Sequence, residues 1–353
     1  MSTKPISGPH ISATRLVDDI MRQVILALLP ALGFGILLYG WPALYLSVLT
    51  VAAALVFEAL CLKIKGVAVM RCLRDGSAMV TGILVAMTLP PWAPWWIGVV
   101  GAALAMILGK HVYGGLGQNL FNPAMLARVA LLISFPIEMT TWVKVTPLLT
   151  GPGPLDSLAI TFAGVAVPDG MTGATTLGAV KTGFSQNQLL PDLLGDYTGL
   201  LAFIGWERGS LGETSSLLLI LGGVWLLRQG IIQWYAPCAL LISIFVLALI
   251  FHGYDAQHYL SPWIHLNSGA LMLVAFFIAT DYVTTPNTPL GQLIFGAGCG
   301  VLIFVIRTWG AYPEGTCFAI LLLNAVTPLV DHYIRPRIYG RYRDGKPIDI
   351  SHP

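Results

Sequence analysis

The chain has 353 residues, of which 56% are hydrophobic and only 10% carry a charged side chain, and its formal net charge is +2. Because an average soluble domain is about 25% charged, this composition excludes a soluble core and predicts a polytopic membrane protein. The near-neutral net charge also gives no basis for binding nucleic acid.

The cysteines and histidines limit the cofactors that the chain could hold. The five cysteines are odd in number and none forms a C-x-x-C pair, which argues against a disulfide framework and a four-thiolate cluster. The histidines fall mostly in predicted loops, which disfavours haem, and their spacing matches no metal site. If the chain carries electrons, a flavin is the carrier that remains.

Apolar segments recur along the whole chain. A helix needs about 20 apolar residues to cross the hydrocarbon layer of a membrane. Hydropathy therefore predicts an all-α polytopic fold with about ten transmembrane helices, five in each half of the chain. The predicted spans are 23–40, 42–62, 76–91, 94–111, 119–136, 213–229, 232–251, 267–285, 290–307 and 316–333.

The distribution of positive charge orients these spans. With the N-terminus inside, 14 of the 19 Lys and Arg residues lie in inner segments and four in outer ones. This bias predicts that both termini are cytoplasmic. The predicted organisation is a cytoplasmic N-terminal segment at 1–22, a first five-helix repeat at 23–136, a long outer loop at 137–212, a second five-helix repeat at 213–333 and a cytoplasmic basic tail at 334–353.

The two halves of the chain resemble each other. Gly114–Phe121 aligns with Ala311–Phe318 at an offset of 197 residues, and Ser77–Val80 aligns with Ser268–Leu271. Since each half has an odd number of spans, the second copy would be inverted relative to the first. Inverted repeats place their sites at broken helices near the midplane of the membrane. The alternative is that apolar helices simply resemble one another.

The most distinctive polar sequence lies in the outer loop. It reads Asp-Gly-Met-Thr-Gly-Ala-Thr, so that the Thr175 hydroxyl follows the small residues Gly173 and Ala174, with Thr172 and the Asp169 carboxylate upstream. An accessible loop with little bulk suits covalent attachment of a phosphorylated cofactor to Thr175. The alternative is an ordinary polar turn rich in glycine and threonine.

A second candidate site lies between the fourth and fifth predicted spans, in 114–123, where glycine and proline should interrupt the helix. Asn119 and Asn122 are three residues apart and share a face if the backbone is helical. Their amides supply both donors and acceptors, as a flavin or quinone edge requires, and amides at membrane depth are costly unless paired. The alternative is that both amides cap a re-entrant turn.

Several ionisable residues lie in or beside the predicted spans, where a charge indicates function. Asp281 falls in the middle of the eighth span, which suits contact with a flavin or an ion, and Arg128 could pair with Asp281 or with Glu58. Glu213 either caps the N-terminus of the sixth span or belongs to an ion path. Lys181, six residues after the loop threonine, is a candidate to offset a phosphate charge.

The pattern Asp-x-x-(Ser/Thr)-Gly-Ala-Thr resembles the flavin-attachment motif of a family of membrane proteins. The family includes the D subunit of the Rnf electron-transport complex and the B subunit of the sodium-pumping NADH:quinone reductase. Without the longer N-terminal extension of the sodium-pump protein, the chain is more similar to the Rnf branch. Thr172 stands where serine is commoner and keeps the hydroxyl. The resemblance covers nearly the whole chain and includes Gly115–Ala124, Gly212–Ser215, Glu314–Leu322, Asn324 and Pro328.

This resemblance implies two flavins. One is FMN joined to Thr175 through a phosphoester, within the attachment motif of Asp169, Thr172, Gly173 and Ala174. The other is a non-covalent riboflavin within the membrane, at Asn119 and Asn122. The implied fold is a pair of inverted five-helix repeats like those of urea channels.

The implied function is that of an electron-carrying component of a redox-driven ion pump in a bacterial inner membrane, with the flavin loop on the periplasmic side. The pump moves electrons between NADH and ferredoxin, coupled to movement of Na⁺ or H⁺. The protein is not catalytic alone: its partners would be the other Rnf subunits (A, B, C, E and G), especially the G subunit, and a flavin transferase for maturation. The alternatives are a passive channel or secondary transporter of the same fold, or a scaffold without a cofactor.

Overall fold

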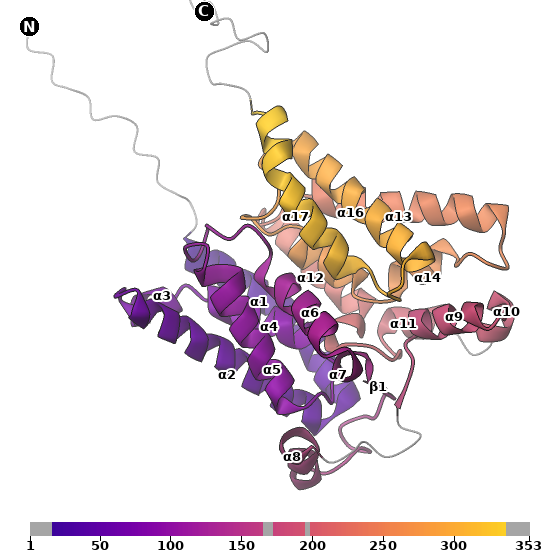
Figure 1. Ribbon diagram of the computed structural model, residues 1–353, viewed down its shortest axis with the longest axis horizontal. Helices are drawn as coiled ribbons and strands as arrows, with labels where there is room; N and C mark the ends of the chain where they lie inside the picture. The colour runs from indigo at the N-terminus through magenta and orange to yellow at the C-terminus, as the bar shows by residue number, and fades with distance from the viewer. Residues whose placement is uncertain (1–15, 165–171, 195–197, 337–353) are drawn as a thin grey trace, which may run out of the picture.

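The structure is a computed structural model that describes residues 16–164, 172–194 and 198–336. These residues are mostly helical, and five of the helices are long and apolar enough to cross a membrane. The protein is therefore a multi-pass membrane protein, as its composition predicted. The five helices are α1 (Val17–Tyr39), α2 (Trp41–Ile64), α13 (Tyr235–Tyr254), α16 (Pro289–Trp309) and α17 (Thr316–Tyr333) (Figure 1).

Shorter helices occupy the other predicted spans. Several have fewer than the ~20 residues of a full span, so the ten-helix inverted repeat stays a prediction. Two of them continue into π-helical turns, which are frequent at functional sites. The shorter helices are α4 (Ser77–Thr88), α5 (Trp95–Ala103) with the π-turn η1 (Leu104–His111), α6 (Pro123–Ser134), α12 (Ser216–Arg228), and α15 (Leu271–Leu273) with the π-turn η3 (Val274–Ile278).

The eighth predicted span, 267–285, is wrong in its extent. Helical structure ends at Ile278, and Asp281 lies in the turn that follows rather than in the middle of a helix. Side chains form hydrogen bonds with polar groups of this turn: the Thr284 hydroxyl donates to Asp281 Oδ2 (3.2 Å), and the Thr285 hydroxyl donates to the Ala279 carbonyl (2.9 Å). These local bonds compete with continued helix, which ends here for that reason.

Small residues allow the most extensive helix contact in the second half, between α13 and α16. A Cβ at Gly300 would lie only 2.6 Å from the Leu240 carbonyl oxygen, and one at Gly296 would overlap the Ala236 carbonyl. Gly296 and Gly300 form a Gly-x-x-x-Gly pair, the spacing that lets membrane helices approach at backbone distance. This contact therefore depends on the absence of side chains at both positions.

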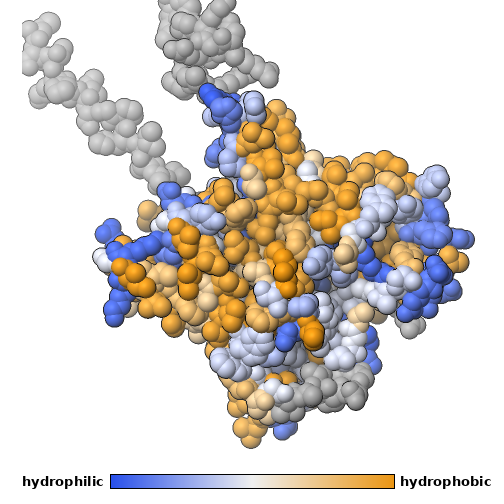
Figure 2. All heavy atoms as spheres, in the orientation of Figure 1, coloured by the Kyte–Doolittle hydropathy of each residue, from blue (hydrophilic) through white to orange (hydrophobic). Residues whose placement is uncertain are grey.

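Apolar side chains cover much of the outside of the helices as well as the core (Figure 2). Leu37, Val56 and Ile242, for example, are each more than half exposed, at 56%, 63% and 60%. An apolar surface this extensive marks contact with lipid or with other proteins. Figure 2 shows hydrophilic residues gathered at the edges of this surface.

The segment predicted as an outer loop, 137–212, is largely folded. Its two strands, β1 (Trp142–Val143) and β2 (Thr172–Gly173), pair antiparallel, so the fold is not purely α-helical. In Figure 1 the helices α8 to α11 lie away from α3 (Val69–Leu73) and from the end of α17. The other elements of the segment are α7 (Pro136–Thr140), α8 (Pro154–Ala163), α9 (Thr176–Ser185), α10 (Leu190–Leu193), α11 (Gly199–Ile204) and the 3-10 turn η2 (Leu211–Glu213); α14 (Pro262–Asn267) follows α13.

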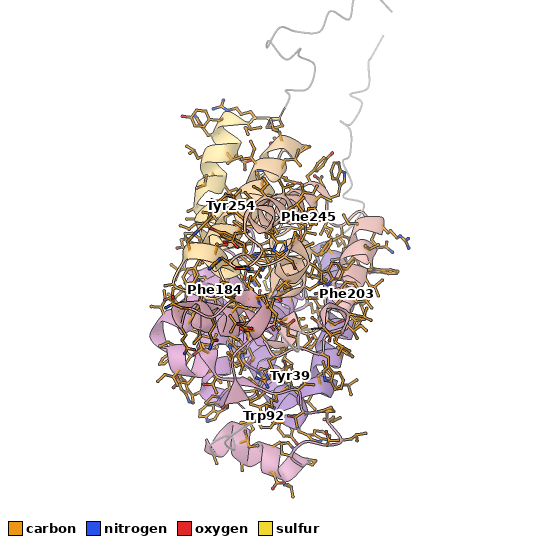
Figure 3. The ribbon with its side chains drawn as sticks, turned by 90° about the vertical axis from the view of Figure 1, so that its right-hand side faces the viewer. Tyr39, Trp92, Phe184, Phe203, Phe245 and Tyr254 are labelled. Atoms are coloured by element: carbon orange, nitrogen blue, oxygen red, sulfur yellow. The ribbon has the colours of Figure 1, made fainter. Side chains whose placement is uncertain are left out.

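Tyr39 ties this outer segment to the first half. At the end of α1, its hydroxyl donates to the Glu207 carbonyl (3.0 Å) and accepts from the Gly209 amide (3.0 Å). The Tyr39 carbonyl in turn accepts from the Trp92 indole N–H (2.8 Å), and Figure 3 shows both rings in the lower part of the body. The residues around Glu207 are thereby held at a fixed position against α1.

Candidate functional site

Thr175 occupies the N-cap of α9, separated from the end of β2 by one residue. Its Oγ1 accepts a hydrogen bond from the Gly178 backbone amide (3.1 Å), as threonine does at many helix N-termini. This bond uses a lone pair of the oxygen, and the half-buried side chain keeps its O–H for esterification. The N-terminus of a helix also favours a negative charge, so a phosphate attached here would be stabilised by the α9 dipole.

Thr175 lines a cavity that we name the anchor cavity. The cavity shares Thr176, Glu207 and Arg208 with a wider groove of about 500 Å³ beside α9, α10 and α11. Its walls combine charged side chains with aromatic rings, a combination suited to a flat, polar-edged ligand. The charged and aromatic residues that line the anchor cavity are Arg128, Glu207, Arg208, Glu213, Glu314, Trp142, Tyr312 and Phe318.

Four charged side chains form an ion cluster, and three of them, Arg128, Glu213 and Glu314, line the anchor cavity. Arg128 of α6 lies 3.5 Å from Glu314 and 3.7 Å from Glu213, and Arg307 of α16 lies 3.6 Å from Glu314. The cluster thus joins the two halves of the chain. The predicted pairing of Arg128 with Asp281 or Glu58 is wrong, because both of its ionic partners are glutamates near the outer segment.

Two atoms of this cluster, Arg128 Nη1 and Arg307 Nε, lack a partner among the described residues, and of the two arginines only Arg128 lines the anchor cavity. Arg128 Nη1 is buried and makes no hydrogen bond with another described residue. Leaving a buried donor unpaired costs about 1–3 kcal/mol, so this N–H is suited to a ligand that brings an acceptor. A carbonyl oxygen of a ligand would satisfy this N–H. The anchor cavity itself encloses only about 50 Å³, so a ligand of flavin size would have to extend into the wider groove.

Glu213 does not cap α12. The N-cap is Ser215, whose Oγ accepts from the Leu218 amide (3.3 Å), while Glu213 Oε1 accepts from the Ser210 hydroxyl (2.8 Å) and faces Arg128. The capping alternative for Glu213 is therefore wrong. Its position two residues before the cap turns its side chain into the anchor cavity.

Arg208 is a site residue that sequence reasoning missed. Its guanidinium packs against Gly173, where any Cβ would overlap Nη1, and it lines the anchor cavity beside Thr175. It forms no salt bridge with another residue of the described part of the chain. The one feature of the sequence that could have pointed to Arg208 is that only four basic residues lie on the predicted outer face, and Arg208 is one of them.

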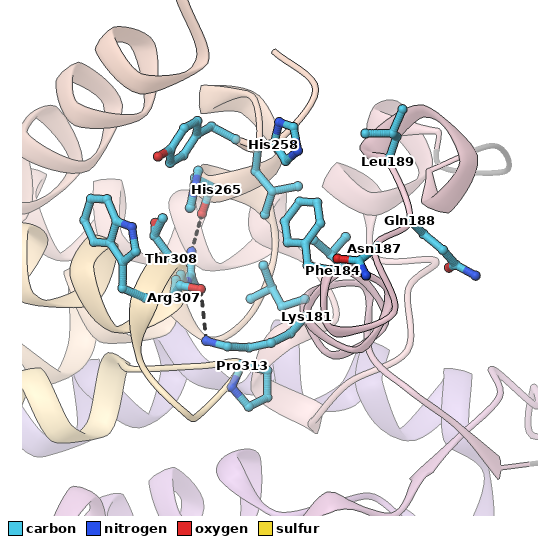
Figure 4. A pocket seen from close by; sticks show the side chains of 15 residues that line it. Lys181, Phe184, Asn187, Gln188, Leu189, His258, His265, Arg307, Thr308 and Pro313 are labelled. Carbon is cyan, nitrogen blue, oxygen red and sulfur yellow. Dashed lines mark hydrogen bonds between the residues drawn. The ribbon is translucent and has the colours of Figure 1, made fainter. Parts of the chain in front are cut away.

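Lys181 does not face Thr175. Its ammonium group donates to the backbone carbonyls of Ile306 and Arg307, near the C-terminal end of α16, and of Tyr312 just beyond it, at 3.1–3.3 Å. Figure 4 draws the bond to Arg307. Cations are favourable at helix C-termini, and these bonds fasten α9 to α16. Partial burial lowers the pKa of Lys181. Lys181 is thus not placed to offset a phosphate on Thr175.

Glu207 adds a carboxyl group to the anchor cavity. Burial raises the pKa of this carboxyl, while hydrogen bonds from Thr176 and Ser268 act in the opposite direction. The Ser268 hydroxyl lies 3.5 Å from Glu207 Oε1. The protonated form of Glu207 is therefore easier to reach than that of an exposed glutamate.

Asn119, Asn122 and Asp281 come together at a second cavity, of about 120 Å³, which we name the inner cavity. Asn122 Nδ2 donates to Asp281 Oδ2 (3.3 Å), and Asn122 Oδ1 caps α6 by accepting from the Ala124 and Met125 amides (3.1 and 3.2 Å). The capping alternative for Asn122 is thus confirmed. Capping occupies only the oxygen, and the amide nitrogen still meets Asp281.

The chain between η1 and α6 is not helical, as the glycines and Pro123 predicted. The condition for a shared helical face of Asn119 and Asn122 is therefore not met; they meet because the backbone bends around the cavity. Asn119 Nδ2 donates to the Phe121 carbonyl (3.2 Å) within this bend. The other residues that line the inner cavity include Ser77, Lys110, Phe276, Phe277 and Thr280.

The attachment motif is only partly covered by the described residues. Asp169 lies outside them, so its predicted part in the motif stays a prediction. Thr172 and Ala174 are exposed, and Gly173 is half-buried beneath Arg208. The last four residues of the motif are therefore accessible from outside.

Comparison with known proteins assigns the chain to a family. The model of the NQR2, RnfD, RnfE family matches residues 5–340. The chain belongs to the NQR2, RnfD, RnfE family. The family match spans Thr175, Asn119, Asn122 and Asp281, so both cavities lie within it.

Several curated relatives resemble the chain over nearly their full length. Each is named as the D subunit of an ion-translocating oxidoreductase complex. The protein of Halorhodospira halophila is 52% identical over 349 residues, 98% of each chain. That of Stutzerimonas stutzeri is 52% identical over 335 residues, 94% of each chain, and that of Citrobacter koseri is 40% identical over 348 residues, covering 95% of this chain and 98% of the relative.

Proposed function

We propose that the protein is a membrane flavoprotein subunit of a redox-driven, ion-translocating oxidoreductase complex, with FMN esterified to Thr175. The observation that carries this proposal is the position of Thr175. Its hydroxyl caps α9, and it lines the anchor cavity together with Arg208 and with Arg128, whose Nη1 has no partner among the described residues. The names of the relatives, which describe the D subunit of an ion-translocating oxidoreductase complex, support the same class of function.

The protein's residues bind and orient the flavin, which supplies the redox chemistry when bound. Thr175 is a tether. Arg208 would balance the charge of the phosphoester, since a guanidinium pairs well with phosphate oxygens. Arg128 Nη1 would donate to an acceptor on the ring. Thr172 and Gly173, with Asp169 and Ala174, would form the motif that a flavin transferase recognises.

A second, non-covalent flavin, riboflavin, is proposed for the inner cavity. Asn122 and Asn119 would present amide groups to its polar edge, and Asp281 would accept from a ring N–H or hold a proton beside it. Phe276 and Phe277 supply apolar walls. Because the cavity encloses about 120 Å³, binding of a whole flavin requires these side chains to move apart.

We infer that the complex lies in a bacterial inner membrane and resembles the Rnf complex. Its other subunits would be of the A, B, C, E and G types, with the G subunit nearest the flavin on Thr175, and the coupling ion would be Na⁺ or H⁺. The proposed topology has ten helices in two inverted repeats, both termini cytoplasmic and the anchor cavity periplasmic. The bias of basic residues and the separation of α9 from α3 and from the end of α17 support it.

Thr175→Val and Thr176→Val form a matched test of the attachment site. The two threonines are neighbours, and only Thr175 caps α9. After expression in cells that contain the flavin transferase, each denatured protein is run on a gel, examined for flavin fluorescence, and digested for mass spectrometry. The proposal requires FMN mass on the Thr175 peptide in the wild type and in Thr176→Val, and none in Thr175→Val. An unmodified wild-type peptide would favour a passive channel or transporter of the same fold.

A further inference from the structure

A chain of hydrogen bonds links the wall of the inner cavity to the turn before α4. Lys110 Nζ donates to Ser77 Oγ (2.8 Å), and Ser77 Oγ donates in turn to Asp75 Oδ1 (2.6 Å). Lys110 and Ser77 are 2% and 4% exposed, whereas Asp75 is half-buried. Because Lys110 and Ser77 both line the inner cavity, the chain runs from that cavity to a carboxylate that solvent can reach.

Glu58 holds Lys110 in place, and His111 in turn contacts Glu58. Glu58 Oε1 accepts from Lys110 Nζ (2.8 Å), and Glu58 Oε2 lies 2.8 Å from His111 Nε2. These groups come from α2 and η1, and Ser77 begins α4, so three elements meet at one ammonium group. A buried ion pair is weak evidence for stability, whereas chains of ionisable side chains within membranes mark proton relays.

Lys110 has one donor left for the cavity. An ammonium group has three N–H bonds, and two of them have partners among the described residues, Glu58 and Ser77. The third is available to a ligand in the inner cavity, whose wall Lys110 forms together with Asp281 and Asn122. A ligand there therefore meets both a proton donor and a carboxyl group.

We propose that Asp75, Ser77 and Lys110 form a proton-transfer route from the α3 side of the membrane to the inner cavity. The inference rests on the proposed flavin in that cavity, because flavin reduction takes up protons. Water protonates Asp75 at the entrance. The Lys110 N–H bond breaks as its proton passes to the ligand. The Ser77 hydroxyl, which donates to Asp75 at rest, then turns toward the Lys110 amine and gives it a proton, and the protonated Asp75 returns a proton to Ser77 Oγ. No electron enters or leaves the route.

Ser77→Ala and Ser77→Thr separate this route from a purely structural role. Ser77→Ala removes the link between Asp75 and Lys110 but leaves the Lys110–Glu58 pair, whereas Ser77→Thr keeps a hydroxyl. Asp75→Asn is the third variant: it retains the oxygen that accepts from the Ser77 amide (2.7 Å) at the start of α4, but it cannot be protonated. All three are made in the complete complex.

The experiment measures acid-extractable flavin per complex, and then the rate of reduction of that flavin by stopped-flow absorbance in H₂O and in D₂O. Ser77→Ala and Asp75→Asn should keep their flavin, but the flavin should be reduced about 100-fold or more slowly than in the wild type, with a larger solvent isotope effect. In Ser77→Thr the rate of flavin reduction should stay near that of the wild type. Formate or azide, small weak acids, should restore part of the rate in Asp75→Asn.

Three results would overturn the route. A wild-type rate in flavin-loaded Ser77→Ala would show that no proton passes Ser77. A slow rate that is equal in H₂O and D₂O and is not rescued by weak acid would show that the cluster is structural. A wild-type complex without extractable flavin would remove the proposed ligand itself, a result distinct from slow reduction in a loaded complex.

Discussion

Replacing Glu314 with glutamine tests the ion cluster at the anchor cavity. The carboxylate lies 3.5 Å from Arg128 and 3.6 Å from Arg307, whose side chains are 6% and 1% exposed. With an effective dielectric constant of about 20, Coulomb's law gives about 4.7 and about 4.6 kcal/mol for these contacts before desolvation is subtracted. Glutamine still accepts from the Ala270 amide but leaves both arginines short of negative charge, and breaking a buried pair typically costs about 3–5 kcal/mol.

The assay is thermal unfolding in detergent, followed with a thiol-reactive dye. Cys299 and Cys317 are buried, so their reaction with the dye reports loss of the fold. At about 2 °C per kcal/mol for a chain of this size, Glu314→Gln should melt about 6–10 °C below the wild type. The control is Glu138→Gln, since Glu138 is half-buried in α7 and makes no salt bridge with another described residue.

A double variant identifies the cause of the loss. Glu314→Gln combined with Arg128→Met leaves one arginine and one glutamate in the cluster, so that its charges balance again, and should recover at least half of the lost melting temperature. The reasoning is refuted if Glu314→Gln melts together with Glu138→Gln. It is also refuted if the double variant melts no higher than Glu314→Gln alone, since the uncompensated arginine would then not be the source of instability.

Three further predictions test separate features. Asn122→Ala should lose the non-covalent flavin and also the α6 cap, which is worth about 0.5–2 kcal/mol. Asn122→Asp should keep the cap but bind no flavin, because its carboxylate faces that of Asp281; acid extraction of each variant measures the flavin that it holds. Gly205→Ala should lower the melting temperature, because Gly205 has a φ of +122° and a Cβ would overlap the Thr214 carbonyl; Gly253→Ala, with no atom within 4 Å, should not. Burial raises the pKa of the Glu207 carboxyl, so the melting temperature of the wild type should fall as pH rises from about 4.3 through that raised pKa, whereas that of Glu207→Gln should not. A difference in melting temperature between the two proteins that does not change with pH would contradict this.

The sequence predicted the class of the protein and the local chemistry of its sites. Composition and hydropathy are summed over many residues, so the prediction of a multi-pass membrane protein does not depend on any single contact. The break before Pro123 was also predictable, because glycine and proline act on their own backbone. Thr175 could be singled out for the same reason: its accessibility and its small neighbours are local properties.

The pairings between distant residues could not be predicted. Arg128 and Glu314 are 186 residues apart, and several acidic residues were equally reasonable partners for the arginine from composition alone. Asp281 was misplaced because apolar residues on both sides hide a turn that its own side chain helps to form. Arg208 was missed because an isolated basic residue in a loop carries no pattern; its significance comes from packing on Gly173.

Thr175 stands at a joint between the two halves of the molecule. On one side, β2 is paired with β1, which continues from α6 and α7; on the other, Lys181 anchors α9 to the end of α16. Ala174 and Thr175 are the two residues between strand and helix. A change in the backbone torsions of these two residues would therefore move α9 relative to β2 and change the direction in which the Thr175 Cα–Cβ bond points.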